Sequence, residues 1–213
     1  PSVGMPAASL RFDPKLLLDH VSARGPRVTD VRGSLVLQSL KLLRDAGHYD
    51  AYAEALPPEH RETLQQALAA SWVSTAALVS HFRVVDSLVP SDAQLARLGE
   101  LLGKQIMDSL FASLIRTARS AGAEAGIWLA LKQVDRIWNR MYQGGGVAVL
   151  QTGPKDAIFE VHGMPVATSR YFRLSHGAFV RASVLMVARV CVVKEVPARR
   201  PSPESLAISI SWV

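Results

Sequence analysis

The sequence predicts an α+β fold: an N-terminal helical region packed on a small antiparallel sheet, with a long helix lying across that sheet. Two patterns carry this prediction. Apolar residues alternate with small or polar ones from Leu206 to Trp212, which is the period of a strand with one buried face. Between Ser91 and Ala121 apolar residues recur every third or fourth position, which is the period of an amphipathic helix.

Residues 144–213 are predicted to form a ββαββ unit. The glycine run at its start, Gly144-Gly145-Gly146, is expected to end the preceding helix and act as a hinge. A phosphate-binding glycine loop would lead into a helix, whereas this run leads into a strand. The long helix is predicted over residues 168–190. The strands are predicted over residues 147–152, 157–162, 191–196 and 206–212.

Residues 13–143 are predicted to be helical, after a flexible leader over residues 1–12. Asp13 and Pro14 match an N-cap and a first helical position, so a short helix is expected up to Gly25. The last two helices are expected to pair antiparallel, because a tight turn joins them. All 213 residues are expected to fold together as one domain. The further helices are expected over residues 30–46, 49–56, 57–70, 72–88, 91–121 and 124–142.

Composition limits the classes of protein to which the chain can belong. Apolar residues make up 49% of the sequence, far from the range of disordered chains. The one cysteine, Cys191, excludes a disulfide within the chain and fits a reducing compartment. No stretch reaches the roughly 18 uninterrupted apolar residues of a spanning helix, and no secretory signal is recognisable. A cytoplasmic location without a membrane span is therefore expected.

The net charge of +6 lies entirely in the second half of the chain. Residues 1–106 carry 11 basic and 11 acidic residues, whereas residues 107–213 carry 13 and 7. A basic half attracts nucleic acid, anionic lipid or acidic partners, but these charges are dispersed as on a solvated surface. No helix-turn-helix, RRM or KH pattern is present, so nucleic-acid binding is the least favoured of the predicted binding functions.

Most catalytic and metal signatures are absent. The sequence has no GxxxxGK[ST], HExxH or GxSxG motif, and its six histidines are too scattered for a zinc site. We therefore predict no catalytic residues, no metal ligands and a non-enzymatic function. Acid–base chemistry would have one candidate, the lone histidine His176.

On a helical wheel, the apolar face of the long C-terminal helix also carries an imidazole and a hydroxyl, His176 and Ser183. Such groups orient a guest in a ligand cavity, and a core histidine bonded to a backbone carbonyl produces the same pattern. Both alternatives remain open. Arg170, Arg173 and Arg181 share another face, which suits either an anion or partner site or a solvated surface.

A ligand cavity is predicted between this helix, the sheet and the helix over residues 124–142. It should be an apolar volume with few polar groups. The predicted ligand-binding residues are Trp128, Trp138, Phe172, His176, Phe179, Ser183 and Trp212.

The second half of the chain resembles a known family in the segments 145–149 and 157–161, in Tyr171-Phe172-Arg173 with Gly177, and in a final strand ending at Trp212. It is similar to the vinyl-reductase-type domains of the superfamily of nitric-oxide-signalling and Golgi-transport ligand-binding domains. The resemblance implies a small-molecule sensor or a structural subunit. Some such domains use cysteines to hold metal or redox ligands, and a chain with Cys191 alone departs from that pattern.

The whole chain also resembles an uncharacterised myxobacterial family of paralogues of about the same length. The matching positions are Val31-Arg32-Gly33, Ala55-Leu56-Pro57, Trp72 and Tyr142-x-Gly-Gly. Haem sensors of nitric oxide hold the propionates with a Tyr-x-Ser-x-Arg run. Residues 169–175 contain those residue types in the wrong order, so neither haem nor any other cofactor is expected.

The function favoured by these observations is a non-enzymatic regulatory module. It would bind an apolar small molecule or a protein partner through the C-terminal helix and hairpins. The alternative is a scaffold or interaction protein, expected to be a homodimer that buries an apolar strip of the helix over residues 91–121.

Overall fold

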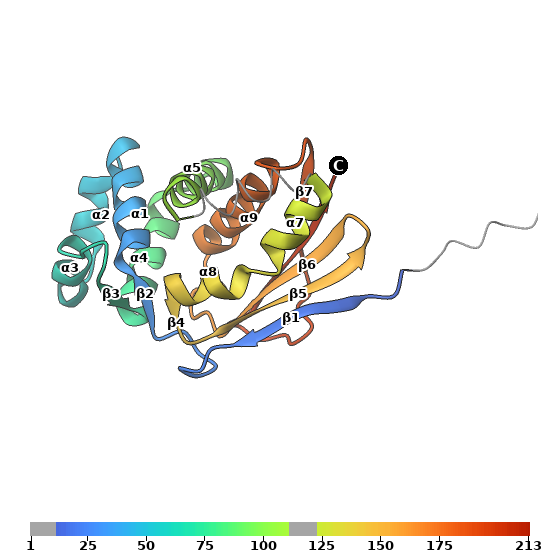
Figure 1. Cartoon of the computed structure of the whole chain (residues 1–213). Coiled ribbons are helices and arrows are strands. Elements are labelled where there is room, and N and C mark those ends of the chain that lie inside the picture. The colour runs from blue at the N-terminus through green and yellow to red at the C-terminus, as the bar shows by residue number, and fades with distance from the viewer. Residues whose placement is uncertain (1–11, 111–122) are drawn as a thin grey trace, which may run out of the picture.

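The computed structural model describes residues 12–110 and 123–213, which share one hydrophobic core (Figure 1). Residues 1–11 of the predicted leader lie outside the described residues, as does the end of the helix predicted over residues 91–121. An antiparallel sheet with the strand order β1-β5-β6-β8-β7 forms one layer. Its strands are β1 (Lys15–Val21), β5 (Gly146–Gly153), β6 (Asp156–His162), β7 (Cys191–Val196) and β8 (Leu206–Trp212).

A second, three-stranded sheet has the order β3-β2-β4. Its strands are β2 (Asp30–Arg32), β3 (Trp72–Ser74) and β4 (Tyr142–Gln143). The predicted α+β class is confirmed, and the C-terminal third has the predicted ββαββ order.

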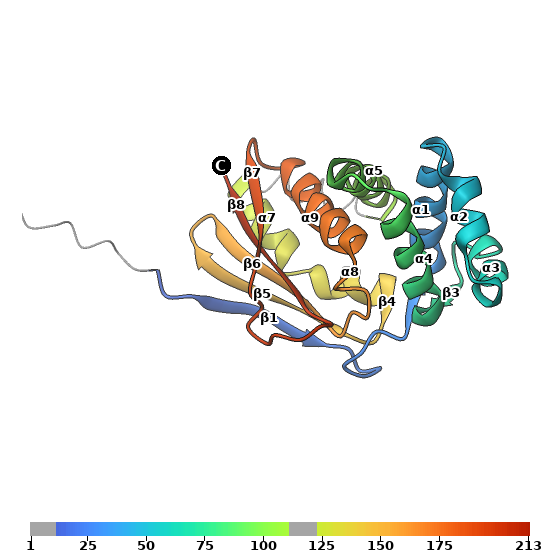
Figure 2. The same cartoon turned by 180° about the vertical axis from the view of Figure 1, so that it is seen from behind.

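Helices enclose the inner face of the main sheet and extend beyond it as a helical layer (Figures 1 and 2). α7, α8 and α9 cover one face of the sheet, while α1 to α4 gather at one end of the molecule. In the described part of the chain, no helix combines the length and the apolar character that a membrane crossing requires. The helices are α1 (Gly33–Asp45), α2 (Tyr49–Ala55), α3 (Pro58–Gln65), α4 (Thr75–Leu88), α5 (Asp92–Leu110), α7 (Ala123–Leu131), α8 (Val134–Met141) and α9 (Arg170–Leu185).

The prediction of a helix from Asp13 to Gly25 is wrong, because this segment contains strand β1, which lies at one edge of the main sheet. β1 pairs antiparallel with β5, from Lys15 opposite Gln151 to Val21 opposite Gly146. The local Asp-Pro signal is overridden by this long-range pairing, which provides the backbone with ladder hydrogen bonds. The region predicted as wholly helical, 13–143, therefore contributes a strand to the C-terminal sheet.

The single helix predicted over residues 124–142 is two helices, α7 and α8, separated by a turn at Lys132 and Gln133. Tyr142 leaves the helical path and pairs with Val31 of β2. The indole N–H of Trp138 donates to the carbonyl of Gly144 at 2.9 Å, which fixes the chain as it turns from α8 into β5. This turn places the end of α8 over the sheet.

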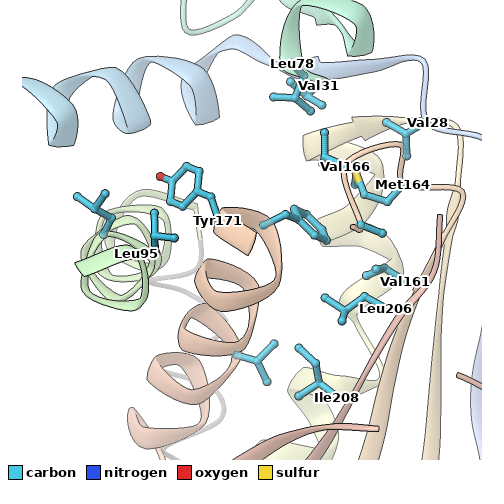
Figure 3. Packing of buried hydrophobic residues seen from close by; sticks show 14 of the residues in the cluster. Val28, Val31, Leu78, Leu95, Val161, Met164, Val166, Tyr171, Leu206 and Ile208 are labelled. Carbon is cyan, nitrogen blue, oxygen red and sulfur yellow. The ribbon is translucent and has the colours of Figure 1, made fainter. Parts of the chain in front are cut away.

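Within the described residues, α5 packs mainly on α9. The tight turn across which it was predicted to pair with the following helix lies outside the described residues. Gly99 makes this close approach possible, because a Cβ atom at that position would overlap the backbone of Ser175. Leu95 and Leu98 of α5 are buried in the same interface region. Figure 3 shows Leu95 and Tyr171 on one side of α9, and Leu206 and Ile208 of the sheet on the other side. α9 is therefore held between α5 and the sheet.

Substituting Gly99 with Ala should lower the free energy of unfolding by about 1–3 kcal/mol, because the added methyl group forces α5 and α9 apart. Urea denaturation measures the change. The matched control is Gly177→Ala on α9, where a Cβ atom meets nothing within 4 Å. That variant should gain about 0.5–1 kcal/mol, since alanine is the better helix former. Equal effects of the two substitutions would contradict the packing described for α5 and α9.

Candidate ligand-binding site

The start of α9 is fixed by side chains that satisfy its free backbone N–H groups. The Ser169 hydroxyl accepts from the N–H of Phe172 at 3.2 Å, as an N-cap. The carboxylate of Asp86, on α4, accepts from the N–H groups of Arg170 and Tyr171 at 3.1 and 2.6 Å. A carboxylate at this position also suits the positive end of the helix dipole. α9 therefore enters the core with a defined position and rotation.

Two cavities lie along the inner side of α9. The first, of about 80 Å³, lies between α1, α4, α9 and the segment after β6. The second, of about 110 Å³, lies between α7, α8, α9 and the main sheet, where the sequence predicted a ligand cavity. Both linings are predominantly apolar, and neither contains a lysine, arginine, aspartate or glutamate.

Four residues line both cavities, and we refer to them as the partition: Met141, Tyr142, His176 and Phe179. Two come from the end of α8 and the start of β4, and two lie one turn apart on α9. The two cavities are therefore neighbours, and the side chains of these four residues lie between them.

His176 is the polar centre of the partition. Its imidazole is stacked between the rings of Phe172 and Phe159, with centroid distances of 5.1 and 5.5 Å and interplanar angles of 18° and 20°. The Nε2 atom is buried and has no hydrogen-bond partner. Burial lowers the pKa of His176 from 6.5 to about 4, so the ring is neutral at pH 7. Nε2 of His176 therefore does not bond to a backbone carbonyl, as it would in one form of the core-histidine alternative.

A hydrogen-bonded group of four buried side chains closes the far end of the first cavity. Ser39 contacts His81 Nε2 at 2.9 Å and the Tyr171 hydroxyl at 3.0 Å. The other imidazole nitrogen of His81, Nδ1, lies 2.8 Å from the Tyr52 hydroxyl. Burial lowers the pKa of His81 to about 4. These polar groups satisfy one another, and they rigidify this end of the cavity.

The sequence analysis missed Ser39, His81 and Tyr142 as residues of the site. A signal for His81 was present, because it lies three residues after Leu78 and four before Val85, on the buried stripe of α4. Ser39 likewise lies between buried residues of α1. A polar residue on each of two facing apolar stripes indicates a buried hydrogen bond once the helices are known to pack.

The structure brings five of the seven predicted ligand-binding residues to these cavities. Trp138, His176, Phe179 and Ser183 line the second cavity, and Phe172 lines the first. Trp128 and Trp212 line neither. They form an edge-to-face pair with ring centroids 4.9 Å apart, and the Trp128 indole donates to the carbonyl of Pro154.

The three predicted anion-binding arginines line a separate groove of about 410 Å³ between α5, α9 and the edge strand β7. Each is paired with a carboxylate of the chain itself. Arg173 forms a bidentate pair with Glu195 at 2.8 and 2.9 Å. An external anion would compete with these carboxylates. The other two pairs are Arg170 with Asp92 at 2.9 Å and Arg181 with Glu100 at 3.4 Å.

No cluster of three or more histidine, cysteine, aspartate or glutamate side chains suited to a metal ion occurs in the segments 12–110 and 123–213. Cys191 is buried and unpaired, and burial raises the pKa of its thiol.

Neither a known family model nor a curated protein sequence matches the chain. Solved structures of H-NOX domains do match its fold. An Fe(II) unliganded H-NOX protein from K. algicida superposes with a TM-score of 0.56 at 11% identity, covering 85% of this chain and 96% of that chain. An oxygen-binding H-NOX domain related to soluble guanylate cyclases, in its oxygen complex, gives 0.50 at 15% identity, covering 85% and 94%.

A third structure, from work on heme distortion in the H-NOX family, gives a TM-score of 0.53 at 14% identity, with 85% and 94% covered. The match spans nearly the whole of each H-NOX chain. At such low identity it establishes the fold. The chain is thus similar to H-NOX domains in fold.

Proposed function

We propose that the chain is a non-enzymatic regulatory module that binds an apolar small molecule in the two cavities beside α9. The observation that carries this proposal is the pair of apolar cavities that meet at a partition with an unpartnered imidazole. Apolar concave sites with few polar groups are typical of small-molecule binding sites. The H-NOX neighbours include a protein that binds oxygen, so this architecture supports ligand binding elsewhere.

Haem does not fit the residues present here. His176 offers a buried imidazole nitrogen without a hydrogen-bond partner, but the space around it is too small for a porphyrin. The cavities of about 80 and 110 Å³ fall below the roughly 300 Å³ at the lower end for drug-sized ligands, and a porphyrin needs more. Neither lining has a lysine or arginine to pair with propionates. The expected ligand is therefore smaller than haem.

The non-enzymatic part of the proposal is supported by the hydrogen bonds of Ser39 and His81. This pair is the nearest approach to a nucleophile and base, with 2.9 Å between Ser39 Oγ and His81 Nε2. The other nitrogen of His81 faces the Tyr52 hydroxyl rather than a carboxylate, and the Ser39 hydroxyl is also engaged by Tyr171. Such a fully satisfied, buried group suits a structural role better than catalysis.

The narrower relationships expected from the sequence are also part of this proposal. We place the chain with the vinyl-reductase-type domains and the myxobacterial paralogues, in the cytoplasm, where a free thiol such as Cys191 persists. The groove of Arg170, Arg173 and Arg181 is proposed as the surface for an acidic partner that would exchange with the internal carboxylates.

The alternative function is a dimeric interaction subunit. The free edge of β7 supports it, because Val190, Val192 and Val213 expose 52%, 61% and 70% of their surface beside an unpaired strand edge. The described part of the helix predicted to form the dimer, α5, is largely occupied by α9. Native mass spectrometry decides between the functions: a dimer without any retained small molecule favours the interaction subunit, and a monomer excludes it.

Benzene should stabilise the folded protein, because dry apolar cavities of comparable size bind it. Titration to millimolar benzene is expected to raise the melting temperature in a saturable manner. Ala130→Leu fills the second cavity, which Ala130 lines, and should reduce the shift to what the first cavity contributes. The matched control, Ala125→Leu, adds the same volume at an exposed position of α7 and should leave the shift intact. A melting temperature indifferent to benzene would refute the proposal.

The pH dependence of stability tests whether the imidazoles are buried and neutral. His81 and His176 have folded-state pKa values lowered to about 4, so the unfolded chain binds more protons below pH 6.5. Stability is thus complete above pH 6.5 and declines as the pH falls towards 4, by up to about 1.4 kcal/mol per pH unit for each histidine. His176→Phe should remove one of these contributions. If the free energy of unfolding falls with pH equally in the wild type and in this variant between pH 6.5 and 5, His176 is not buried in its neutral form.

A further inference from the structure

The polar groups that line the two cavities fall into two classes. Most are satisfied within the protein. Ser175 donates to the carbonyl of Phe172 at 3.2 Å, and Ser183 donates to the carbonyl of Phe179 at 2.8 Å. The group of Ser39, His81, Tyr52 and Tyr171 is closed on itself. None of these side chains is left in need of a hydrogen bond from a guest.

The second class consists of two groups, and both belong to the partition. Nε2 of His176 is buried without a partner. Tyr142 is half-buried, and its hydroxyl makes no hydrogen bond within the part of the chain that the structure describes. The Tyr142 ring is held in place by packing on Trp138, with ring centroids 4.3 Å apart. A buried and unpaired group such as Nε2 of His176 is rare in protein interiors, because it loses its hydrogen bonds to water without replacement.

Both partition groups are uncharged at pH 7. Burial lowers the pKa of His176 to about 4 and raises the pKa of the Tyr142 hydroxyl. Since neither cavity is lined by a charged residue, a charged ligand would lose its hydration without gaining an ion pair. The site therefore selects a neutral molecule.

The cavity volumes set the size of that molecule. An apolar cavity of about 150 Å³ holds one benzene ring, and the cavities here measure about 80 and 110 Å³. A single ring thus occupies one cavity after a small adjustment, and its substituent reaches the partition. Met141 is suited to such an adjustment, because its unbranched side chain changes rotamer readily.

We propose that the ligand is a neutral single-ring molecule that carries one hydroxyl or comparable hydrogen-bonding group. Nε2 of His176 and the Tyr142 hydroxyl bind this group at the partition. This inference rests on the ligand-binding function proposed above. The ring lies on the apolar side chains, and the hydrogen bonds orient it. A phenol-like compound has this chemistry, and its hydroxyl both donates and accepts.

The test compares phenol, benzene and benzoate as probes on the full chain, with affinities from calorimetry at pH 7. The wild type should bind phenol about tenfold or more tightly than benzene, and should not bind benzoate. His176→Phe preserves a ring between Phe159 and Phe172 and should bind phenol and benzene equally. Tyr142→Phe should lower the preference for phenol in part. Tyr49→Phe, a control that removes a hydroxyl outside both cavities, should preserve it.

Each outcome bears on one proposal or on both. Equal binding of phenol and benzene by the wild type, or a phenol preference that survives in both His176→Phe and Tyr142→Phe, overturns the hydrogen-bonding inference and leaves the ligand-binding function standing. Failure of both neutral probes to bind overturns the function and the inference together. Circular dichroism checks that the variants fold. If His176→Phe does not fold, Tyr142→Phe and His176→Gln decide, and the glutamine variant should retain a preference for phenol.

Discussion

The position of α9 is the constraint on which the rest of the structure depends. Asp86 holds the first N–H groups of the helix, and Gly99 lets α5 approach the helix on its outer side. α9 is thereby fixed by contacts that do not involve its inner face. The inner face does not have to fill the space towards the sheet for the helix to stay in place, and the second cavity remains there. The first cavity lies beside the start of the helix, against α1 and α4.

This arrangement explains how a well-packed protein keeps cavities at its centre. Cavities cost stability, because the side chains around them lose contacts. Here the cost is offset by dense packing elsewhere: Leu40, Leu43, Leu64 and Leu95 are completely buried. The polar group around His81 stiffens the helical wall of the first cavity, and the β5–β6 pairing provides the opposite wall of the second. A rigid frame around an incompletely filled centre is a preorganised site for a small guest.

Sequence patterns were sufficient where the structure is governed by local periodicity. The alternation from Leu206 to Trp212 identified β8 to the residue, because one face of that strand is fully buried, whereas Ser209 and Ser211 on the other face are only half-buried. The helical wheel placed His176, Phe179 and Ser183 on one face of α9, and they line one cavity. β1 was missed because its pairing partner, β5, lies far away in the sequence and cannot be read from local signals.

The sequence also could not show how far along a helix or strand each predicted site residue lies. Trp128 was placed beside the apolar stripe of its helix and Trp212 on the buried face of its strand, but the two indoles pair with each other next to the Pro154 turn. Periodicity gives the direction of a side chain around an axis and not its height along that axis. Tyr142 was missed for a related reason, since its role arises where the predicted helix breaks and β4 begins.

The central claim is that the inner face of α9 is not filled by the protein's own side chains. A crystal structure determined under xenon pressure tests it most directly, because xenon enters dry apolar cavities and is easily located. Xenon should bind between α9, α8 and the main sheet, in contact with Phe179 and beside His176. A structure in which side chains from α8 and the sheet close completely on α9, with no xenon between them, would contradict the account.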